Sequence, residues 1–336
     1  MAATKTFLTG IQTSGEPHIG NYVGAIKPAL AAAESSDTLY FLADYHSLNT
    51  VKDPDRLRHN IRSVAATWLA CGLDPDRTVI YRQSSVPEVF ELSVILSSVT
   101  GKGLMNRAHA YKAARDRNAE AGSADLDAGV NMGLFNYPLL MAADILVMET
   151  DYVPVGRDQA QHLEYAADIA GSFNHLYGAS YSFPIPQGVY NEGDAAVLPG
   201  TDGRKMSKSY DNTIPLFLPE NRLRKLVRRI PTDSTPVEEP KNPDSSVVFQ
   251  LLTHFEEPAR LAETRKRLEA GGMGWGELKD QLFEAINTEV APMRVRYERL
   301  MEPDSELDGI LAAGAVRARE RSRRVLAKVR RAVGID

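Results

Sequence analysis

Hydrophobic positions follow two different spacings along the first 214 residues of the chain. Short apolar runs, as in Thr38–Ala43 and Thr78–Arg82, are typical of strands that are covered on both faces. Longer stretches with apolar residues at helical spacing alternate with them. One of these begins at Pro54 and ends near Gly72 and Pro75, residues that stop helices. The alternation predicts an α/β fold with a doubly wound, mainly parallel, Rossmann-like sheet.

The same criteria predict the remaining elements of this part. Two more strands are expected at Lys5–Gly10 and Tyr152–Val155. Four more helices are expected at Gly20–Glu34, Pro87–Val99, Gly133–Met148 and Asp158–Ser172. The segment Arg115–Ala128 is polar and short of large apolar side chains, so we expect it to be exposed and mobile. Residues Phe183–Gly203 are rich in Gly, Pro and Asp, which predicts strand ends and loops.

The pattern changes near Pro215 and is nearly all helical afterwards, with polar breaks at Pro231–Ser246 and Gly271–Gly274. We therefore predict two domains, residues 1–214 and a smaller helical domain of residues 215–336. The last helix either extends from that domain or packs back on the first one.

Composition excludes several classes of protein. With 43% hydrophobic and 25% charged residues the chain is of globular type. No uninterrupted apolar run approaches the roughly 18 residues of a membrane-spanning helix. The single cysteine, Cys71, cannot form an internal disulfide, and the N-terminal segment lacks the apolar stretch of a signal peptide. We expect a cytoplasmic protein with no membrane partner.

Positive charge is concentrated in two segments, although the net charge is -5. Arg317–Arg331 holds eight Lys or Arg residues and one acid, and Arg222–Arg229 holds five basic residues on one predicted helix. Basic helices in an acidic protein are typical of a local phosphate-binding surface. Solvated helical faces would have the same composition, and the charge pattern alone leaves both interpretations open.

A glycine-containing loop, Thr9–Asn21 (TGIQTSGEPHIGN), connects the first predicted strand to the first helix. Its glycines allow the backbone to approach a ligand at the carboxyl end of the strand. The helix that begins near Gly20 offers N–H groups suited to phosphate. His18 and Asn21 add side-chain donors beside that anion. Taken alone, the loop would be an ordinary turn.

A second loop carries Lys205–Ser209 (KMSKS), whose ammonium and hydroxyl groups can surround a polyphosphate. Alone it would be a solvated basic loop. Its occurrence about 185 residues after His18–Asn21 (HIGN) makes coincidence an unsatisfactory explanation. The chain contains no G-K-[ST], which excludes a Walker phosphate loop.

These two motifs together resemble the signature pair of class I aminoacyl-tRNA synthetases. Further segments are similar to the tryptophanyl members of that family: GIQTSGEPHIGNYVGA, YPLLMAADIL, VPVGRDQAQHLE and the Thr-Asp-Ser at 232–234. The resemblance runs from about residue 6 to the C-terminus, with the motifs in the family's order. It implies a catalytic domain at 1–214 and a helical anticodon-binding domain at 215–336.

The resemblance also implies which residues form the site. His18, Lys205 and Lys208 match catalytic positions. The matching ATP-binding positions are Gln12, Thr13, Ser14, Gly20, Asn21, Gly156, Arg157, Asp158, Val197, Lys205, Met206, Ser207, Lys208 and Ser209. Arg157 replaces the usual Glu, so only a backbone role is carried over there. Lys112 is the candidate for a mobile phosphate contact, in a segment that departs from the family pattern.

The positions that match the amino-acid pocket are Leu8, Tyr137, Met141, Asp144 and Gln159. Leu8 replaces a frequent aromatic residue. Asp144 lies inside the apolar helix MAADILVM, where an unpaired carboxylate is costly. It either accepts the indole N–H, as the resemblance implies, or has a structural partner. His46, which follows a predicted strand, either borders the site or is a satisfied loop histidine, and we favour the second interpretation.

The implied activity is that of a tryptophan–tRNA ligase, with ATP, L-tryptophan and tRNA(Trp) as partners and a homodimer as the assembly. Mg²⁺ is expected to enter with ATP, and no dedicated metal site is expected. The alternatives are a tyrosyl enzyme of the same fold, a small nucleotidyltransferase and a non-catalytic RNA-binding or regulatory paralogue. Met141 argues against the first alternative, the helical region from about 217 onward against the second, and the intact motif residues against the third.

Overall fold

A five-stranded parallel sheet lies at the centre of the first domain in the computed structural model, which describes residues 5–33, 37–155, 160–189 and 198–336. The strand order is β3-β2-β1-β4-β5. The strands are β1 (Thr6–Ile11), β2 (Asp37–Leu42), β3 (Val79–Arg82), β4 (Tyr152–Pro154) and β5 (Gln187–Val189). The order reverses between β1 and β4, which makes the carboxyl ends of these strands the expected ligand site. The predicted fold class is confirmed.

Strand β2 shows why the sheet is covered on both faces. Leu39 and Phe41 pack in one hydrophobic cluster, and Tyr40 and Leu42 pack in another on the opposite face. Side chains of a strand alternate between the two faces, so a continuous apolar run fills both. The helices on the two sides are therefore joined through one sheet.

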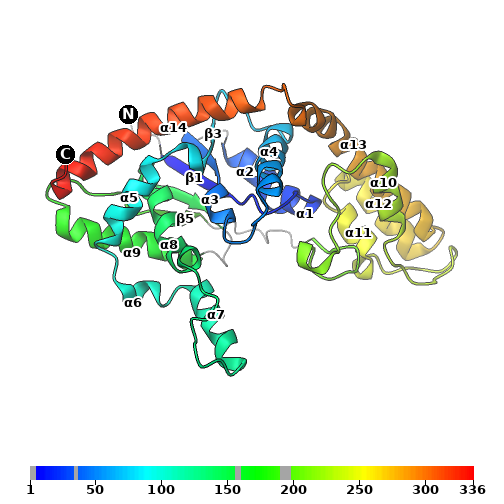
Figure 1. Ribbon diagram of the computed structural model, residues 1–336. Coiled ribbons are helices and arrows are strands. Elements are labelled where there is room, and N and C mark those ends of the chain that lie inside the picture. Colours follow the sequence, from blue (N-terminus) through cyan, green and yellow to red (C-terminus); the bar gives the residue numbers. More distant parts are fainter. Residues whose placement is uncertain (1–4, 34–36, 156–159, 190–197) are drawn as a thin grey trace.

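Helices flank the sheet on both sides (Figure 1). They are α1 (Ile19–Asn21), α2 (Lys27–Ala33), α3 (Asp44–Ser47), α4 (Pro54–Ala70), α5 (Glu88–Ser97), α6 (Lys102–Met105), α7 (His109–Glu120), α8 (Met132–Leu146) and α9 (Ala160–Tyr177). Of these, α3, α6 and α7 are additional to the helices predicted. A π-helical turn, η1 (Tyr22–Ile26), joins α1 to α2, and a 3-10 turn, η2 (Gln83–Ser85), follows β3. The single helix predicted at Gly20–Glu34 is thus three helical pieces.

The segment Arg115–Ala128 has no buried residue and is largely exposed, as expected, but its first half is helical because α7 continues through it to Glu120. The helix buries Tyr111 and Ala114, and Tyr111 donates a hydrogen bond of 2.8 Å to Asp127. The Asn118 amide also donates to the Leu126 and Ala128 carbonyls. These contacts fold the polar segment back on the helix, which projects from the rest of the domain (Figure 1).

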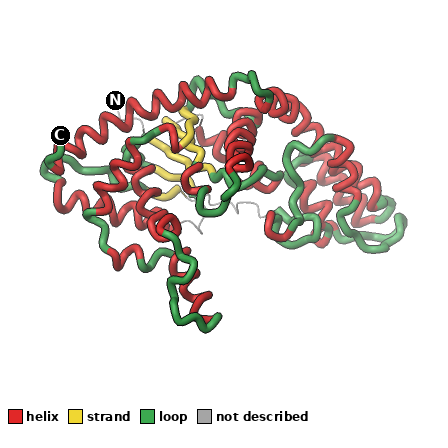
Figure 2. Tube along the Cα trace, in the orientation of Figure 1, coloured by secondary structure: helices red, strands yellow, loops and turns green. Residues whose placement is uncertain are grey.

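The chain beyond residue 215 is helical, and α10–α13 lie together at one end of the molecule (Figure 2). Its helices are α10 (Glu220–Arg228), α11 (Val247–Leu252), α12 (Pro258–Ala270), α13 (Trp275–Met301) and α14 (Leu307–Val333), with the 3-10 turn η5 (Pro243–Ser245). A further 3-10 turn, η4 (Lys208–Tyr210), precedes this region. Within the described residues, no helix has the length and apolar character that crossing a membrane requires.

Helix α14 runs back from this group along the edge strand β3 and helix α5 (Figure 1). Gly314 lies so close to β3 that an added Cβ would be 1.8 Å from the Ile80 carbonyl oxygen. Basic side chains of α14 pair with carboxylates of the first domain. These pairs are Arg319 and Arg323 with Glu88, Arg321 with Asp37, Lys328 with Glu149 and Arg330 with Glu91. Much of the positive charge of Arg317–Arg331 is therefore directed toward the first domain.

Candidate active site

The glycine-containing loop leaves the carboxyl end of β1 and turns into α1. His18 is buried at the start of that helix, and its backbone N–H donates a hydrogen bond of 3.1 Å to the Asn21 side chain. Gln12, Ser14 and Asn21 are exposed, as ligand contacts require. One backbone N–H at the start of α1 is not available to a ligand, because the Ile19 N–H donates to the Ile214 carbonyl at 2.9 Å.

The Lys205–Ser209 loop lies against this first loop, although about 185 residues separate them. A Cβ added at Gly15 would be 3.0 Å from the Lys208 ammonium, and one at Gly20 would be 3.3 Å from the Met206 sulfur. The segment after the second loop also pairs with the first, since Leu216 N–H donates to the Pro17 carbonyl at 3.1 Å. The glycines thus provide the space in which the two motifs meet.

Asn212, which the sequence analysis missed, fixes the shape of the second loop. Its side-chain oxygen accepts from the Ser207 N–H at 2.8 Å, and its amide donates to the Lys205 carbonyl at 3.0 Å. Asn212 is buried, and a Cβ at Gly200 would collide with it. Lys205 and Lys208 remain exposed at the loop surface, where they can meet a polyphosphate.

The imidazole of His18 is held in its neutral form. Burial, and to a smaller extent the nearby Lys208 ammonium, lowers the pKa of His18 to about 4. Its Nδ1 atom is buried and has no hydrogen-bond partner in the described part of the chain. A neutral ring with an unused nitrogen can donate one hydrogen bond to a phosphoryl oxygen.

Asp144, on α8, is 2% exposed and has two side-chain partners. His46 Nε2 lies 3.0 Å from its Oδ2 atom, and the Gln83 amide lies within 2.9 Å of both carboxylate oxygens. Burial raises the pKa of Asp144, while the hydrogen bonds from His46 and Gln83 lower it. His46, on α3, therefore borders Asp144, which agrees with the less favoured of the two interpretations open to it from the sequence.

His46 and Gln83 follow consecutive parallel strands, β2 and β3, at their carboxyl ends. Because ligands of parallel sheets bind at the carboxyl ends of the strands, the positions of both residues directly after a strand mark them as site candidates. No local sequence motif marks Gln83. Helix α3, at the carboxyl end of β2, also contacts the glycine-containing loop. The Thr13 hydroxyl and N–H donate to the Ser47 hydroxyl, on α3, at 2.8 and 3.2 Å. Thr13 is fully buried, so its side chain serves the framework of the loop.

The other predicted pocket residues have different surroundings. Leu8 is buried, and partly buried Met141 packs against the same hydrophobic cluster, on the face of the sheet that α8 covers. The Tyr137 hydroxyl is hydrogen-bonded to His162, and burial raises the pKa of Tyr137 to about 12. The remaining predicted positions Gly156, Arg157, Asp158, Gln159 and Val197 lie outside the described residues. Within the described ranges, no group of three or more His, Cys, Asp or Glu residues could hold a metal ion.

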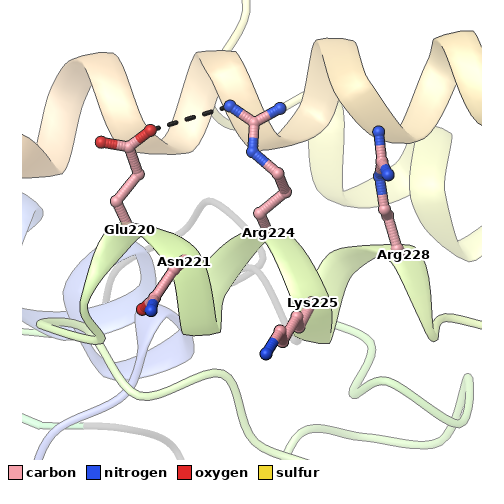
Figure 3. A pocket seen from close by; sticks show the side chains of 5 residues that line it. All are labelled: Glu220, Asn221, Arg224, Lys225 and Arg228. Atoms are coloured by element: carbon pink, nitrogen blue, oxygen red, sulfur yellow. Dashed lines mark ion pairs between the residues drawn. The ribbon is translucent and has the colours of Figure 1, made fainter.

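Helix α10 carries a basic surface away from these loops. Glu220, Asn221, Arg224, Lys225 and Arg228 line a surface depression of about 580 Å³ (Figure 3). The Arg224 guanidinium lies 3.9 Å from the centre of the Phe283 ring, and Arg228 pairs with Asp280 at 3.0 Å. Helix α13 thus holds these two arginines, whereas Lys225 is exposed and points away from them in Figure 3.

Comparison with known proteins identifies the family. The family model described as tRNA synthetases class I (W and Y) matches residues 2–291. The tryptophan–tRNA ligase of Xanthomonas axonopodis pv. citri is 53% identical over 335 residues, which cover 99% of this chain and 77% of that protein. The tryptophan–tRNA ligase of Neisseria meningitidis is 51% identical over 333 residues, which cover 98% of both chains.

A solved structure agrees with the sequence matches. Tryptophanyl-tRNA synthetase from Campylobacter jejuni, complexed with ADP and tryptophan, has a TM-score of 0.89 and 42% identity to this chain. The match covers 98% of this chain and 99% of the other. With identities above 50% along nearly its whole length, the chain belongs to the tryptophanyl-tRNA synthetases, within the class I tRNA synthetase family.

Proposed function

We propose that this chain is a tryptophan–tRNA ligase that joins L-tryptophan to ATP and then transfers tryptophan to tRNA(Trp). In the first step a carboxylate oxygen of tryptophan forms a bond to the α-phosphorus of ATP, and the bond to the pyrophosphate oxygen breaks. One observation supports this proposal above all: the glycine-containing loop and the Lys205–Ser209 loop lie against each other, with Gly15 next to Lys208. Buried Asp144 is held by residues that follow neighbouring strands of the same sheet.

In this reaction the protein mainly positions the two substrates and stabilises the charge that develops on the phosphates. In our proposal His18 donates a hydrogen bond to the α-phosphoryl group, which its neutral imidazole can do. Lys205 and Lys208 neutralise the departing pyrophosphate. Mg²⁺ enters with ATP as part of the substrate and retains several of its waters. Gln12, Ser14, Gly20, Asn21, Met206, Ser207 and Ser209 are the proposed surrounding contacts.

The proposed amino-acid pocket selects by the indole N–H, which Asp144 accepts, with Leu8, Met141 and Tyr137 around the ring. Phenylalanine has no such donor and would leave the remaining acceptor site of the buried carboxylate, beyond those bonded to His46 and Gln83, without a hydrogen bond. A site built in this way rejects the donor-less analogue by roughly 10⁴–10⁵.

Residues 215–336 are the proposed tRNA-binding domain, and the proposed assembly is a homodimer in the cytoplasm. The α14 cations pair largely with the first domain, so the exposed Arg222 and Lys225 of α10, with Arg229 directly after it, are the better candidates for phosphate contacts. Changing these three residues to Gln should weaken charging and lower its log–log salt slope by roughly 0.7–0.9 per lost contact. A wild-type slope in the triple variant would remove α10 from the tRNA surface.

The alternatives receive less support. The family model covers both the tryptophan and the tyrosine enzymes, but the relatives at about 50% identity are tryptophan–tRNA ligases. The full-length match also disfavours a small nucleotidyltransferase.

Charging of a tRNA(Trp) transcript tests the proposal. With ATP and labelled tryptophan the chain should form acid-precipitable tryptophanyl-tRNA, and tyrosine should give none. Tyrosine charging, or binding of the transcript without any charging, would favour the tyrosyl enzyme or the non-catalytic paralogue.

A further inference from the structure

Gln83 is a fully buried polar residue that none of the site motifs includes. It begins η2, directly after β3, and its side-chain amide donates to both oxygens of Asp144, at 2.9 Å to Oδ1 and 2.8 Å to Oδ2. A buried amide with both ends bonded is a fixed element of a site.

The orientation of this amide follows from its second contact. The Tyr45 N–H donates to Gln83 Oε1 at 3.2 Å, so the oxygen faces Tyr45 and the NH₂ group faces Asp144. The reversed amide would place an oxygen against the carboxylate and an NH₂ group against an N–H. Both contacts would then be repulsive, so the backbone of α3 determines which way Gln83 points.

The two oxygens of Asp144 are not equivalent. Among the described residues, Oδ2 is contacted by both His46 Nε2 and Gln83, whereas Oδ1 is contacted by Gln83 alone. A carboxylate oxygen has about two lone-pair sites, so Oδ1 retains acceptor capacity that Oδ2 has used.

We propose that Gln83 is the positioning residue for tryptophan selection, because it turns the Asp144 carboxylate so that Oδ1 is presented to the indole N–H. This inference rests on the proposed function, in which Asp144 accepts that donor. Gln83 itself does not contact the substrate in this scheme, and its effect passes through Asp144.

The polar and charged groups around Asp144 predict how the pH dependence of tryptophan affinity changes when the Gln83 amide is lost. The groups that face it are His46 and Asp44 on α3, Tyr81 on β3 and Gln83. Burial and Asp44 raise the pKa of Asp144, while His46 and Gln83 lower it. Loss of the Gln83 amide therefore raises that pKa further, and tryptophan affinity should begin to fall at a higher pH as the solution is acidified.

Gln83→Met keeps the length of the side chain and removes both donors. In tryptophan-dependent pyrophosphate exchange we expect the tryptophan KM to rise about tenfold to 100-fold, with kcat little changed. The acid limb of the KM profile should move to higher pH. A KM within about twofold of wild type, with an unmoved acid limb, would overturn the inference.

Gln83→Glu supplies a second test that does not depend on lost packing. When the introduced carboxyl group and Asp144 share a proton, the introduced group can still donate, but two ionised carboxylates repel. The tryptophan KM of this variant should therefore rise with increasing pH, opposite to the trend of the wild type. A KM that follows the wild-type trend would contradict the positioning role.

Gln281→Met is the matched control, because Gln281 is also a buried glutamine with two side-chain partners, Thr264 and Glu256, but lies on α13. Its thermal stability should fall, while its tryptophan KM and pH profile stay at wild-type values. An equal rise in KM in this control would show that the Gln83 effect is general destabilisation. Failure of the wild-type chain to exchange with tryptophan would instead refute the proposed function.

Discussion

Replacing Gly314 by Ala tests whether α14 packs on the edge of the sheet. A Cβ at this position would be 1.8 Å from the Ile80 carbonyl oxygen and 2.8 Å from its carbon. Both atoms belong to the backbone of β3, which its hydrogen bonds to β2 restrain. To restore ordinary contact at 3.4 Å, the helix would have to withdraw by roughly 1.5 Å.

Two effects of opposite sign determine the result. Alanine favours the helix over glycine by about 1 kcal/mol. Overpacking against a rigid neighbour costs about 1–3 kcal/mol, and withdrawal also loosens buried Leu311 and Ala318. Since the neighbour is backbone, we take the upper end of that range. The expected net loss is about 2 kcal/mol in the free energy of unfolding.

Gly309→Ala provides the control in the same helix, because in the described part of the chain no atom beyond the neighbouring backbone of α14 lies within 4 Å of a Cβ added there. It should be neutral or stabilising by up to about 1 kcal/mol. Urea unfolding followed by far-UV circular dichroism would compare the two variants. If Gly314→Ala were as stable as Gly309→Ala, the close packing of α14 on β3 would be refuted.

Three further predictions concern the site. Lys208→Ala should lower kcat for pyrophosphate exchange far more than it raises the tryptophan KM, because pyrophosphate charge develops in the transition state; a changed KM alone would remove this lysine from the catalytic residues. Asp144→Asn should lower kcat/KM for tryptophan by on the order of 2–4 kcal/mol, and wild-type kinetics would leave Asp144 only a structural role. His18, whose pKa is lowered from 6.5 to about 4, makes the folded state lose stability as the pH falls through that window, because only the unfolded chain binds the proton there. His18→Gln should therefore flatten the decline of unfolding free energy between these pH values, by up to about 3 kcal/mol, and an unchanged decline would contradict the assignment.

The elements with strong patterns could be predicted from the sequence. The β2 run and the long amphipathic helix α4 lie within a residue or two of their predicted bounds. Helix α7 could not be predicted in the same way. Its stability depends on Tyr111 contacting Asp127 and on Asn118 bonding carbonyls further along the chain, contacts that hydrophobic periodicity does not contain.

In the candidate site, too, some residues could be predicted from the sequence and others could not. The two motif loops could be paired from the sequence because their residue types are specific to phosphate chemistry. His46 and Gln83 could not be assigned to Asp144, since the three residues come from separate elements that meet only in the folded sheet. The sequence also could not predict which way the α14 arginines point, because this depends on their ion pairs with the carboxylates of Asp37, Glu88 and Glu91.

The most direct test of the account is ATP–pyrophosphate exchange with each of the amino acids offered in turn, without tRNA. Tryptophan should support exchange, and phenylalanine should support less by roughly 10⁴–10⁵ in kcat/KM, because it leaves the remaining acceptor site of buried Asp144 without a hydrogen bond. Tyrosine should also be a poor substrate. No exchange with tryptophan, or faster exchange with tyrosine, would contradict the assignment of this site.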